Sequence, residues 1–177
     1  MAKVTIRDSE RVLTDPAEIE EFVDQYSLEY ERWDIDKWHS DEAQQLEAET
    51  EEERILEVFS DEIERLKQRG GYQTADVVAL SPDTPNLDEL LAKFDKEHEH
   101  TEDEVRFVVD GRGIFTIHGE DDTVFDVEVH PGDLLVVPEG TWHWFDLCED
   151  KQIKCIRVFS SKDGWVAHYR DPQVAAE

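Results

Sequence analysis

Basic residues are scarce in this sequence of 177 residues, which has 18 Lys and Arg against 46 Asp and Glu and a formal net charge of −28. Proteins neutralise the phosphates of nucleic acids with Lys and Arg side chains, so the composition argues against a nucleic-acid partner. Most of the acidic side chains should form a solvated surface. Their field is screened within about 8 Å at physiological ionic strength, so charges inside a site still decide whether an anionic substrate binds.

Cysteines and long apolar segments are also lacking. The two cysteines, Cys148 and Cys155, are too few for a disulfide framework, and we interpret both as small core residues or unreactive thiols. No apolar run approaches the length of a membrane-spanning helix, and residues 1–8 lack the apolar core of a signal peptide. We therefore expect a cytoplasmic protein without membrane contact. Its length fits one domain over residues 1–177.

The first part of the chain, about residues 1–95, has mainly helical patterns. A helix is predicted to start at Thr14-Asp15-Pro16, where a capping side chain precedes a proline of the first turn. A second helix is expected within residues 41–69, where an apolar face is formed by Ile55, Phe59, Ile63 and Leu66 and Gly70-Gly71 can end the helix. Residues 44–53 are so acidic that they could be helical or loose. The other expected elements are a strand over 72–80, a loop over 81–86 and a short helix over 87–94.

The second part, about residues 96–177, changes to short β-segments separated by glycine-bearing or charged turns. The predicted strands cover 104–110, 113–118, 124–129, 133–137, 141–146 and 153–160. Many short strands of this kind are typical of an antiparallel barrel or a double-sheet jelly roll. Helices come first and strands second, which predicts an α+β fold with N-terminal helices and a β-barrel core.

Three histidines and one glutamate have the spacing of a metal site. In an extended chain, side chains two apart point to the same face, so His98 and His100 present two imidazoles to one point. Glu104 lies an even number of residues from His98 and His100 and so would face the same side, although residues 101–103 can form a bulge. A second strand places His143 beside them. A single H-x-H is more often a pair of solvated residues. Three neutral imidazoles and one carboxylate, however, suit a divalent metal such as iron, nickel, cobalt or manganese.

Both segments match the two motifs of the cupin superfamily, G-x5-H-x-H-x3,4-E-x6-G and G-x5-P-x-G-x2-H-x3-N. The matching residues are His98, His100, Glu104 and Gly111 in the first motif, and Gly132, Pro138, Gly140 and His143 in the second. Ala92 and Leu147 depart from the motifs at positions that are not ligands. The cupin resemblance implies a double-stranded β-helix, or jelly roll, as the core.

Further segments resemble one cupin family, the acireductone dioxygenases, almost from end to end. They are Glu31-Arg32-Trp33, Lys93-Phe94, Asp103 to Phe107, Gly111 to Phe115, Pro138 to Phe145, Ile156 to Phe159 and Gly164-Trp165-Val166. The resemblance implies a dioxygenase of methionine salvage that cleaves acireductone, 1,2-dihydroxy-3-keto-5-(methylthio)pentene, with O2. With one Fe(II) per chain the family forms 4-methylthio-2-oxobutanoate and formate, and with Ni(II) it forms 3-methylthiopropanoate, formate and CO.

The resemblance also implies roles for residues around the metal. Arg106 follows Glu104 by two positions and is expected to be catalytic, because a fixed cation would favour binding or ionisation of the enediol. The residues expected to bind substrate are Phe94, Arg106, Phe145, Arg157 and Trp165. The remaining histidines, His39, His118, His130 and His168, are assigned surface or structural roles.

Two alternatives stay open at this point. A cupin-type sugar-phosphate isomerase uses the same ligand types, although this chain offers few basic or hydroxyl groups for a phosphate. A non-enzymatic small-molecule-binding cupin would use the same core without consuming oxygen. Nothing in the sequence indicates an obligate oligomer, so we expect a monomer.

Overall fold

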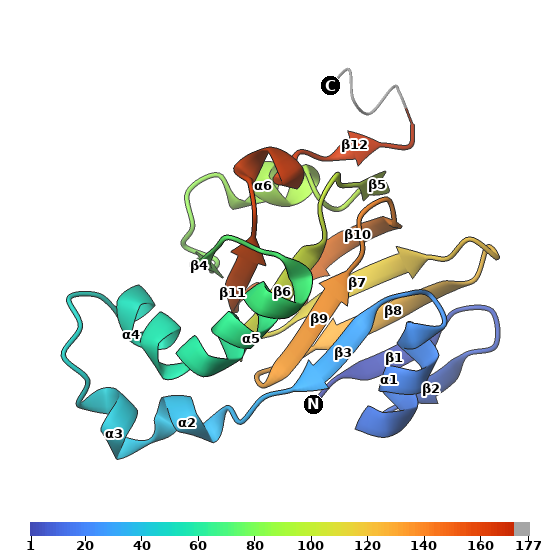
Figure 1. Cartoon of the computed structure of the whole chain (residues 1–177). Helices are drawn as coiled ribbons and strands as arrows, with labels where there is room; N and C mark the ends of the chain where they lie inside the picture. Colours follow the sequence, from blue (N-terminus) through green and yellow to red (C-terminus); the bar gives the residue numbers. More distant parts are fainter. Residues whose placement is uncertain (172–177) are drawn as a thin grey trace.

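The computed structural model describes residues 1–171, and these residues form two antiparallel sheets with helices packed against them (Figure 1). In spatial order, the larger sheet consists of β12 (His168–Tyr169), β5 (His98–Glu99), β10 (Trp142–Leu147), β7 (Gly113–His118), β8 (Val124–Val129), β1 (Lys3–Ile6) and β2 (Arg11–Leu13). The smaller sheet consists of β3 (Glu29–Arg32), β9 (Asp133–Val137), β6 (Glu104–Gly111), β11 (Ile153–Phe159) and β4 (Thr74–Leu80). No strand pair joins the two sheets in this part of the chain. The fold is therefore the double-sheet jelly roll of a cupin and not a closed barrel.

Most of the helices occur in the first half of the chain, in the connections between β2 and β5. They are α1 (Pro16–Asp24), α2 (Asp36–His39), α3 (Asp41–Gln44), α4 (Glu51–Val58), α5 (Ser60–Gly70), α6 (Leu87–Ala92) and the short 3-10 helix η1 (Lys162–Trp165). The predicted α+β class is confirmed. The predicted strand over 72–80 and the six strands of the second part are all present, with ends within two residues of the prediction. None of the helices in residues 1–171 is long and apolar enough to cross a membrane.

The helix predicted within residues 41–69 is divided into α3, α4 and α5. The stretch that could be helical or loose is mostly non-helical, and the prediction of one unbroken helix across Phe59 is wrong. Thr50 starts a new helix, since its side chain accepts a hydrogen bond from the backbone N–H of Glu53 at 3.1 Å. Phe59 then separates α4 from α5 with a non-helical backbone. The two predicted helix boundaries are confirmed. Asp15 caps α1, and Gly71 ends α5 with a positive φ of 74° that favours glycine.

The sequence did not predict three N-terminal strands, which precede most of the helices and join the sheets. β1 and β2 form a hairpin that extends the larger sheet beyond β8, and β3 lies at the edge of the smaller sheet beside β9. These strands give weak sequence signals. β2 has three residues, and β3 reads Glu-Tyr-Glu-Arg with only Tyr30 buried. Their partners, and not their own composition, make them strands.

The central strands of the smaller sheet are covered on both faces, and this arrangement positions the site. The outer face of this sheet packs against α4 and α5, where Phe59 and Trp33 contact the ring of Phe107 at centroid distances of 4.9 Å and 4.4 Å. Its inner face meets the larger sheet in a second apolar cluster. The run Asp133–Val137 is consequently buried at every position. Side chains on the inner face of β6 and β11 therefore point between the sheets.

Candidate metal centre

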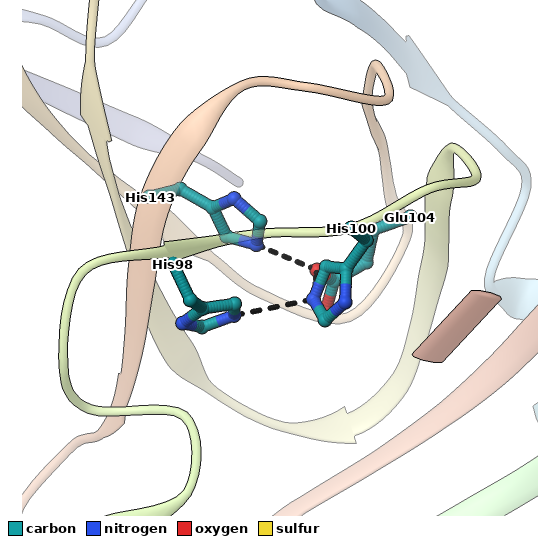
Figure 2. A group of neighbouring side chains, drawn as sticks. All are labelled: His98, His100, Glu104 and His143. Carbon is teal, nitrogen blue, oxygen red and sulfur yellow. Dashed lines mark hydrogen bonds and ion pairs between the residues drawn. The ribbon is translucent and has the colours of Figure 1, made fainter. Parts of the chain in front are cut away.

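The four predicted ligands come together between the sheets (Figure 2). His98 starts β5, His100 follows it, Glu104 starts β6, and His143 lies on β10 directly opposite His98. Each of the four offers one nitrogen or oxygen atom, and these atoms lie within 4.8 Å of one another. The three imidazoles are buried. Within residues 1–171, this is the only group of three or more such side chains placed to hold a metal ion.

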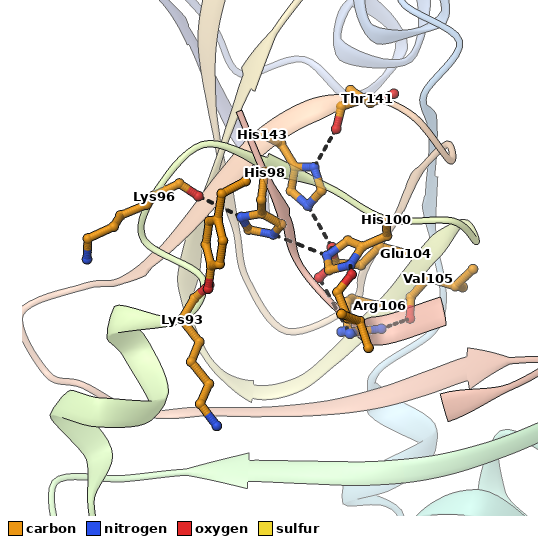
Figure 3. A network of polar contacts seen from close by, with 11 residues as sticks. Lys93, Lys96, His98, His100, Glu104, Val105, Arg106, Thr141 and His143 are labelled. Atoms are coloured by element: carbon orange, nitrogen blue, oxygen red, sulfur yellow. Dashed lines mark hydrogen bonds and ion pairs between the residues drawn. The ribbon is translucent and has the colours of Figure 1, made fainter. Parts of the chain in front are cut away.

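Each imidazole is oriented by a backbone carbonyl on its outer side (Figure 3). The Nδ1 atoms of His98, His100 and His143 lie 2.6 Å, 3.1 Å and 2.8 Å from the carbonyl oxygens of Lys96, Val166 and Thr141. A carbonyl oxygen only accepts hydrogen bonds, so each Nδ1 carries the proton and donates it. Each Nε2 therefore presents a lone pair to the interior of the site.

The inward atoms are all electron donors to a cation. The Nε2 atoms of His98 and His100 lie 3.1 Å apart, and Oε2 of Glu104 lies 2.8 Å from Nε2 of His143. Lone pairs facing one another at these distances repel unless a positive charge lies between them. Burial, and then electrostatic repulsion between His98 and His143, lower the pKa of His98 to about 4, so this imidazole is neutral near pH 7. The donor set therefore fits a divalent metal ion.

Glu104 and Arg106 add one fixed charge of each sign. Burial by itself raises the pKa of Glu104, but the charge of Arg106 and the contacts with His100 and His143 hold it well below its usual range. Burial disfavours the charged form of Arg106 as well and therefore lowers its pKa, although a guanidinium keeps its proton in proteins. Nη2 of Arg106 lies 3.5 Å from Oε1 of Glu104, and Nη1 donates to the carbonyl of Val105 at 3.0 Å.

Two carboxylates that sequence reasoning missed hold the turn between His100 and Glu104. Glu102 accepts hydrogen bonds from the backbone N–H groups of Ser160 and Ser161. Asp103 accepts from the hydroxyl of Tyr72 at 2.7 Å and from the backbone N–H of Glu139 at 3.0 Å, and Glu139 lies in the loop that leads to His143. No sequence signal distinguishes these two carboxylates from the other acidic residues of the chain. The turn replaces the bulge that the spacing had suggested.

A cavity of about 150 Å³ opens beside the ligands, roughly ten times the volume that one water molecule requires. All the residues predicted to bind substrate line it, namely Phe94, Arg106, Phe145, Arg157 and Trp165. The sequence did not predict the rest of its apolar wall, which includes Val78, Leu80, Phe115, Ile153 and Cys155. The cavity therefore has a polar end at the histidines and an apolar end between β4, β7 and β11.

The other predicted residues lie outside the ligand group. His118 contacts Glu97 at 2.6 Å, and His130 contacts Glu128 at 2.8 Å. Cys155 is buried in the cavity wall, where burial raises the pKa of its thiol to about 12. Cys148 is half-buried, and both cysteines are free thiols.

Comparison with known proteins agrees with this geometry. Residues 4–167 match the family described as the ARD/ARD' family. An acireductone dioxygenase of Bacillus velezensis is 47% identical over 98% of this chain and 99% of that protein. One from a Sulfurihydrogenibium species is 45% identical over 99% and 98% of the two chains. A solved acireductone dioxygenase of Bacillus anthracis, with a cadmium ion in its active centre, superposes with a TM-score of 0.88 at 43% identity, covering 96% of this chain and 98% of that one.

Proposed function

The chain belongs to the ARD/ARD' family, and we propose that it is a metal-dependent dioxygenase that cleaves acireductone with O2 in methionine salvage. The observation that carries this proposal is the convergence of three Nε2 lone pairs and one carboxylate at the polar end of a cavity between the sheets. Arg106 stands beside them as a fixed cation. An enediol needs both features, since its oxygens must be gathered and its negative charge stabilised.

We assign the metal to His98, His100, Glu104 and His143, which would hold one Fe(II) or Ni(II) per chain. The ion would supply Lewis acidity and coordination positions for the oxygens of the enediol. The carbonyls of Lys96, Val166 and Thr141 keep each imidazole in the tautomer that a metal requires. The site contains no thiolate ligand that would select one of these two ions by softness, which supports the proposal that it accepts either.

We assign Arg106 the catalytic task of stabilising the anionic form of the substrate. Its guanidinium is buried and partly neutralised by Glu104 at 3.5 Å, so its remaining donors can bind a second anion within the cavity. Charge stabilisation of this kind is strong where water is excluded. Phe94, Phe145 and Trp165 form walls that exclude water and contact the apolar methylthio end of the substrate.

The apolar wall argues against the first of the two alternatives, and oxygen consumption separates the second. A sugar phosphate needs hydroxyl and cationic groups along its whole length, whereas Val78, Leu80 and Phe115 line the end of the cavity away from the ligands. A non-enzymatic binding protein could share the wall, but it would not consume oxygen. A cytoplasmic location, a monomeric state and a single domain over residues 1–177 remain predictions.

Reconstitution tests both the reaction and the choice of products. The protein is stripped of metal, loaded separately with Fe(II) and Ni(II), and supplied with acireductone and O2. Loading with Fe(II) should yield 4-methylthio-2-oxobutanoate and formate, whereas Ni(II) should yield 3-methylthiopropanoate, formate and CO. The free metal salts and the metal-free protein serve as controls, because an enediol also reacts with O2 unaided. No oxygen uptake above these controls contradicts the dioxygenase proposal, and identical products from both metals contradict the control of products by the metal.

A further inference from the structure

Three charged side chains form a row across the inner face of the smaller sheet. Arg106 on β6 lies directly opposite Arg157 on β11, and Arg157 lies directly opposite Asp76 on β4. Like charges on neighbouring strands repel each other, so the two arginines place an unfavourable pair beside the cavity. Asp76 compensates this repulsion at the Arg157 end of the row, as Glu104 does beside Arg106.

Asp76 holds Arg157 in a two-point ion pair. Nε and Nη2 of Arg157 donate to the two carboxylate oxygens of Asp76 at 2.8 Å and 2.7 Å, and both side chains are largely shielded from solvent. A bidentate ion pair of this kind, with two parallel hydrogen bonds, fixes the plane of the guanidinium as well as its position. One edge of Arg157 is therefore occupied by Asp76 and is not free to bind a substrate.

The guanidinium of Arg157 also lies over an aromatic ring of the cavity wall, that of Trp165. The guanidinium carbon of Arg157 lies 3.9 Å from the ring centroid of Trp165. Trp165 is the last residue of η1. Its ring also contacts the ring of Phe159, with a centroid distance of 4.3 Å. A cation at this distance from a tryptophan ring attracts it strongly when both are partly desolvated. The orientation of Trp165 thus depends on where Arg157 is held.

We propose that Asp76 is a positioning residue of the substrate pocket, which holds Arg157 in place and through it sets the Trp165 ring against the cavity. Arg157 then acts on the substrate through Trp165 and not as a direct ligand. The structural part of this inference stands on the contacts alone. Its kinetic consequence rests on the proposed function, because Trp165 must then contact acireductone.

The chain contains a matched control for this arrangement. On the larger sheet, Asp126 makes a two-point ion pair with Arg7 at 3.0 Å and 2.9 Å, and Arg7 lies over the ring of Trp144 at 5.5 Å. The two acids are equally exposed, at 25% for Asp126 and 26% for Asp76. Trp144 is not among the residues that line the cavity. Asp126→Asn therefore repeats the chemical change of Asp76→Asn away from the pocket.

Fluorine NMR of protein labelled with 5-fluorotryptophan tests the positioning directly. The chain has five tryptophans, and Trp165→Phe and Trp144→Phe assign the two relevant signals. Asp76→Asn should shift or broaden the Trp165 signal and leave that of Trp144 unchanged, whereas Asp126→Asn should do the reverse. An unchanged Trp165 signal in folded Asp76→Asn protein overturns the proposal. If that variant does not fold, Arg157→Lys replaces it, because Lys keeps the charge but has no planar face, and the same signal must move.

A double-variant cycle on the metal-loaded enzyme tests the kinetic consequence. Loss of one ordered aromatic contact should raise KM for acireductone about threefold to tenfold in Asp76→Asn, with a smaller change in kcat. In a Trp165→Ala background the same substitution should have little effect on KM, since the ring through which Asp76 acts is gone. Additive effects of the two substitutions contradict the proposal. If the parent consumes no oxygen, the proposed function fails, while the NMR result still decides whether Asp76 positions Trp165.

Discussion

Acidification of the metal-free protein tests the geometry of the ligand group through His98. Burial, followed by electrostatic repulsion between His98 and His143, lowers the pKa of His98 to about 4 from an ordinary value of 6.5. Between these two pH values the unfolded chain binds a proton that the folded chain does not bind. The stability that depends on a neutral His98 is therefore fully present above pH 6.5, and it is lost as the pH falls towards 4.

The size of this loss follows from the two pKa values. One pKa unit corresponds to about 1.4 kcal/mol, so the interval from 6.5 to about 4 bounds the loss at roughly 3 kcal/mol. His98 is only 1% exposed, so solvent screening does not reduce this figure. Domains of ordinary size have about 5–15 kcal/mol of stability, which makes such a loss readily measurable.

Urea unfolding of the metal-free protein, followed by tryptophan fluorescence across this pH range, is the assay. His98→Gln is the control, because it removes the titrating group while the other acids and histidines titrate in both proteins. The free energy of unfolding should fall by roughly 3 kcal/mol more in the parent than in the variant. Parallel curves for the two proteins would refute the reasoning. In the metal-loaded parent, protons compete with the ion for Nε2, so metal release should accompany the fall.

Three further experiments test the remaining assignments. His143→Ala should lower metal affinity by more than the roughly 10–100-fold that loss of an outer partner costs, with an unchanged circular dichroism spectrum. His130→Ala is its control, and full metal content in His143→Ala contradicts the ligand assignment. Arg106→Ala should keep the metal and lower kcat/KM about 100-fold or more, with partial recovery in Arg106→Lys, as measured by oxygen uptake. Parent-like turnover in Arg106→Ala would make Arg106 a structural residue. In a Cys148→Ser background, Cys155 should react with a thiolate-specific reagent only after urea unfolding, because burial raises its pKa to about 12, and rapid reaction of the folded protein argues against that burial.

The sequence by itself determined the ligand group and most of the jelly roll. His98 and His100 are two residues apart in an extended segment, and alternation along a strand sends both to one side. Six of the later strands were predictable because their glycine-bearing turns and apolar runs are local signals. β3 was not, since its residues Glu29–Arg32 are mostly polar and become a strand by pairing with β9. The break at Phe59 was missed because a single apolar face continues across it, from Ile55 in α4 to Ile63 in α5.

Only the tertiary structure decided which of the many carboxylates serve the site. With 46 acidic residues in the chain, no local pattern shows that Asp76 pairs with Arg157, 81 positions away, or that Asp103 holds the hydroxyl of Tyr72. Such choices follow from strand register, since β11 places Arg157 opposite both Arg106 and Asp76. Register is set by the packing of whole sheets and not by the residues that it brings together. The ligands, and the carbonyls of Lys96 and Thr141 that orient two of them, are therefore determined by local spacing. The groups that position Arg157 and shape the pocket come together only once the sheets have formed.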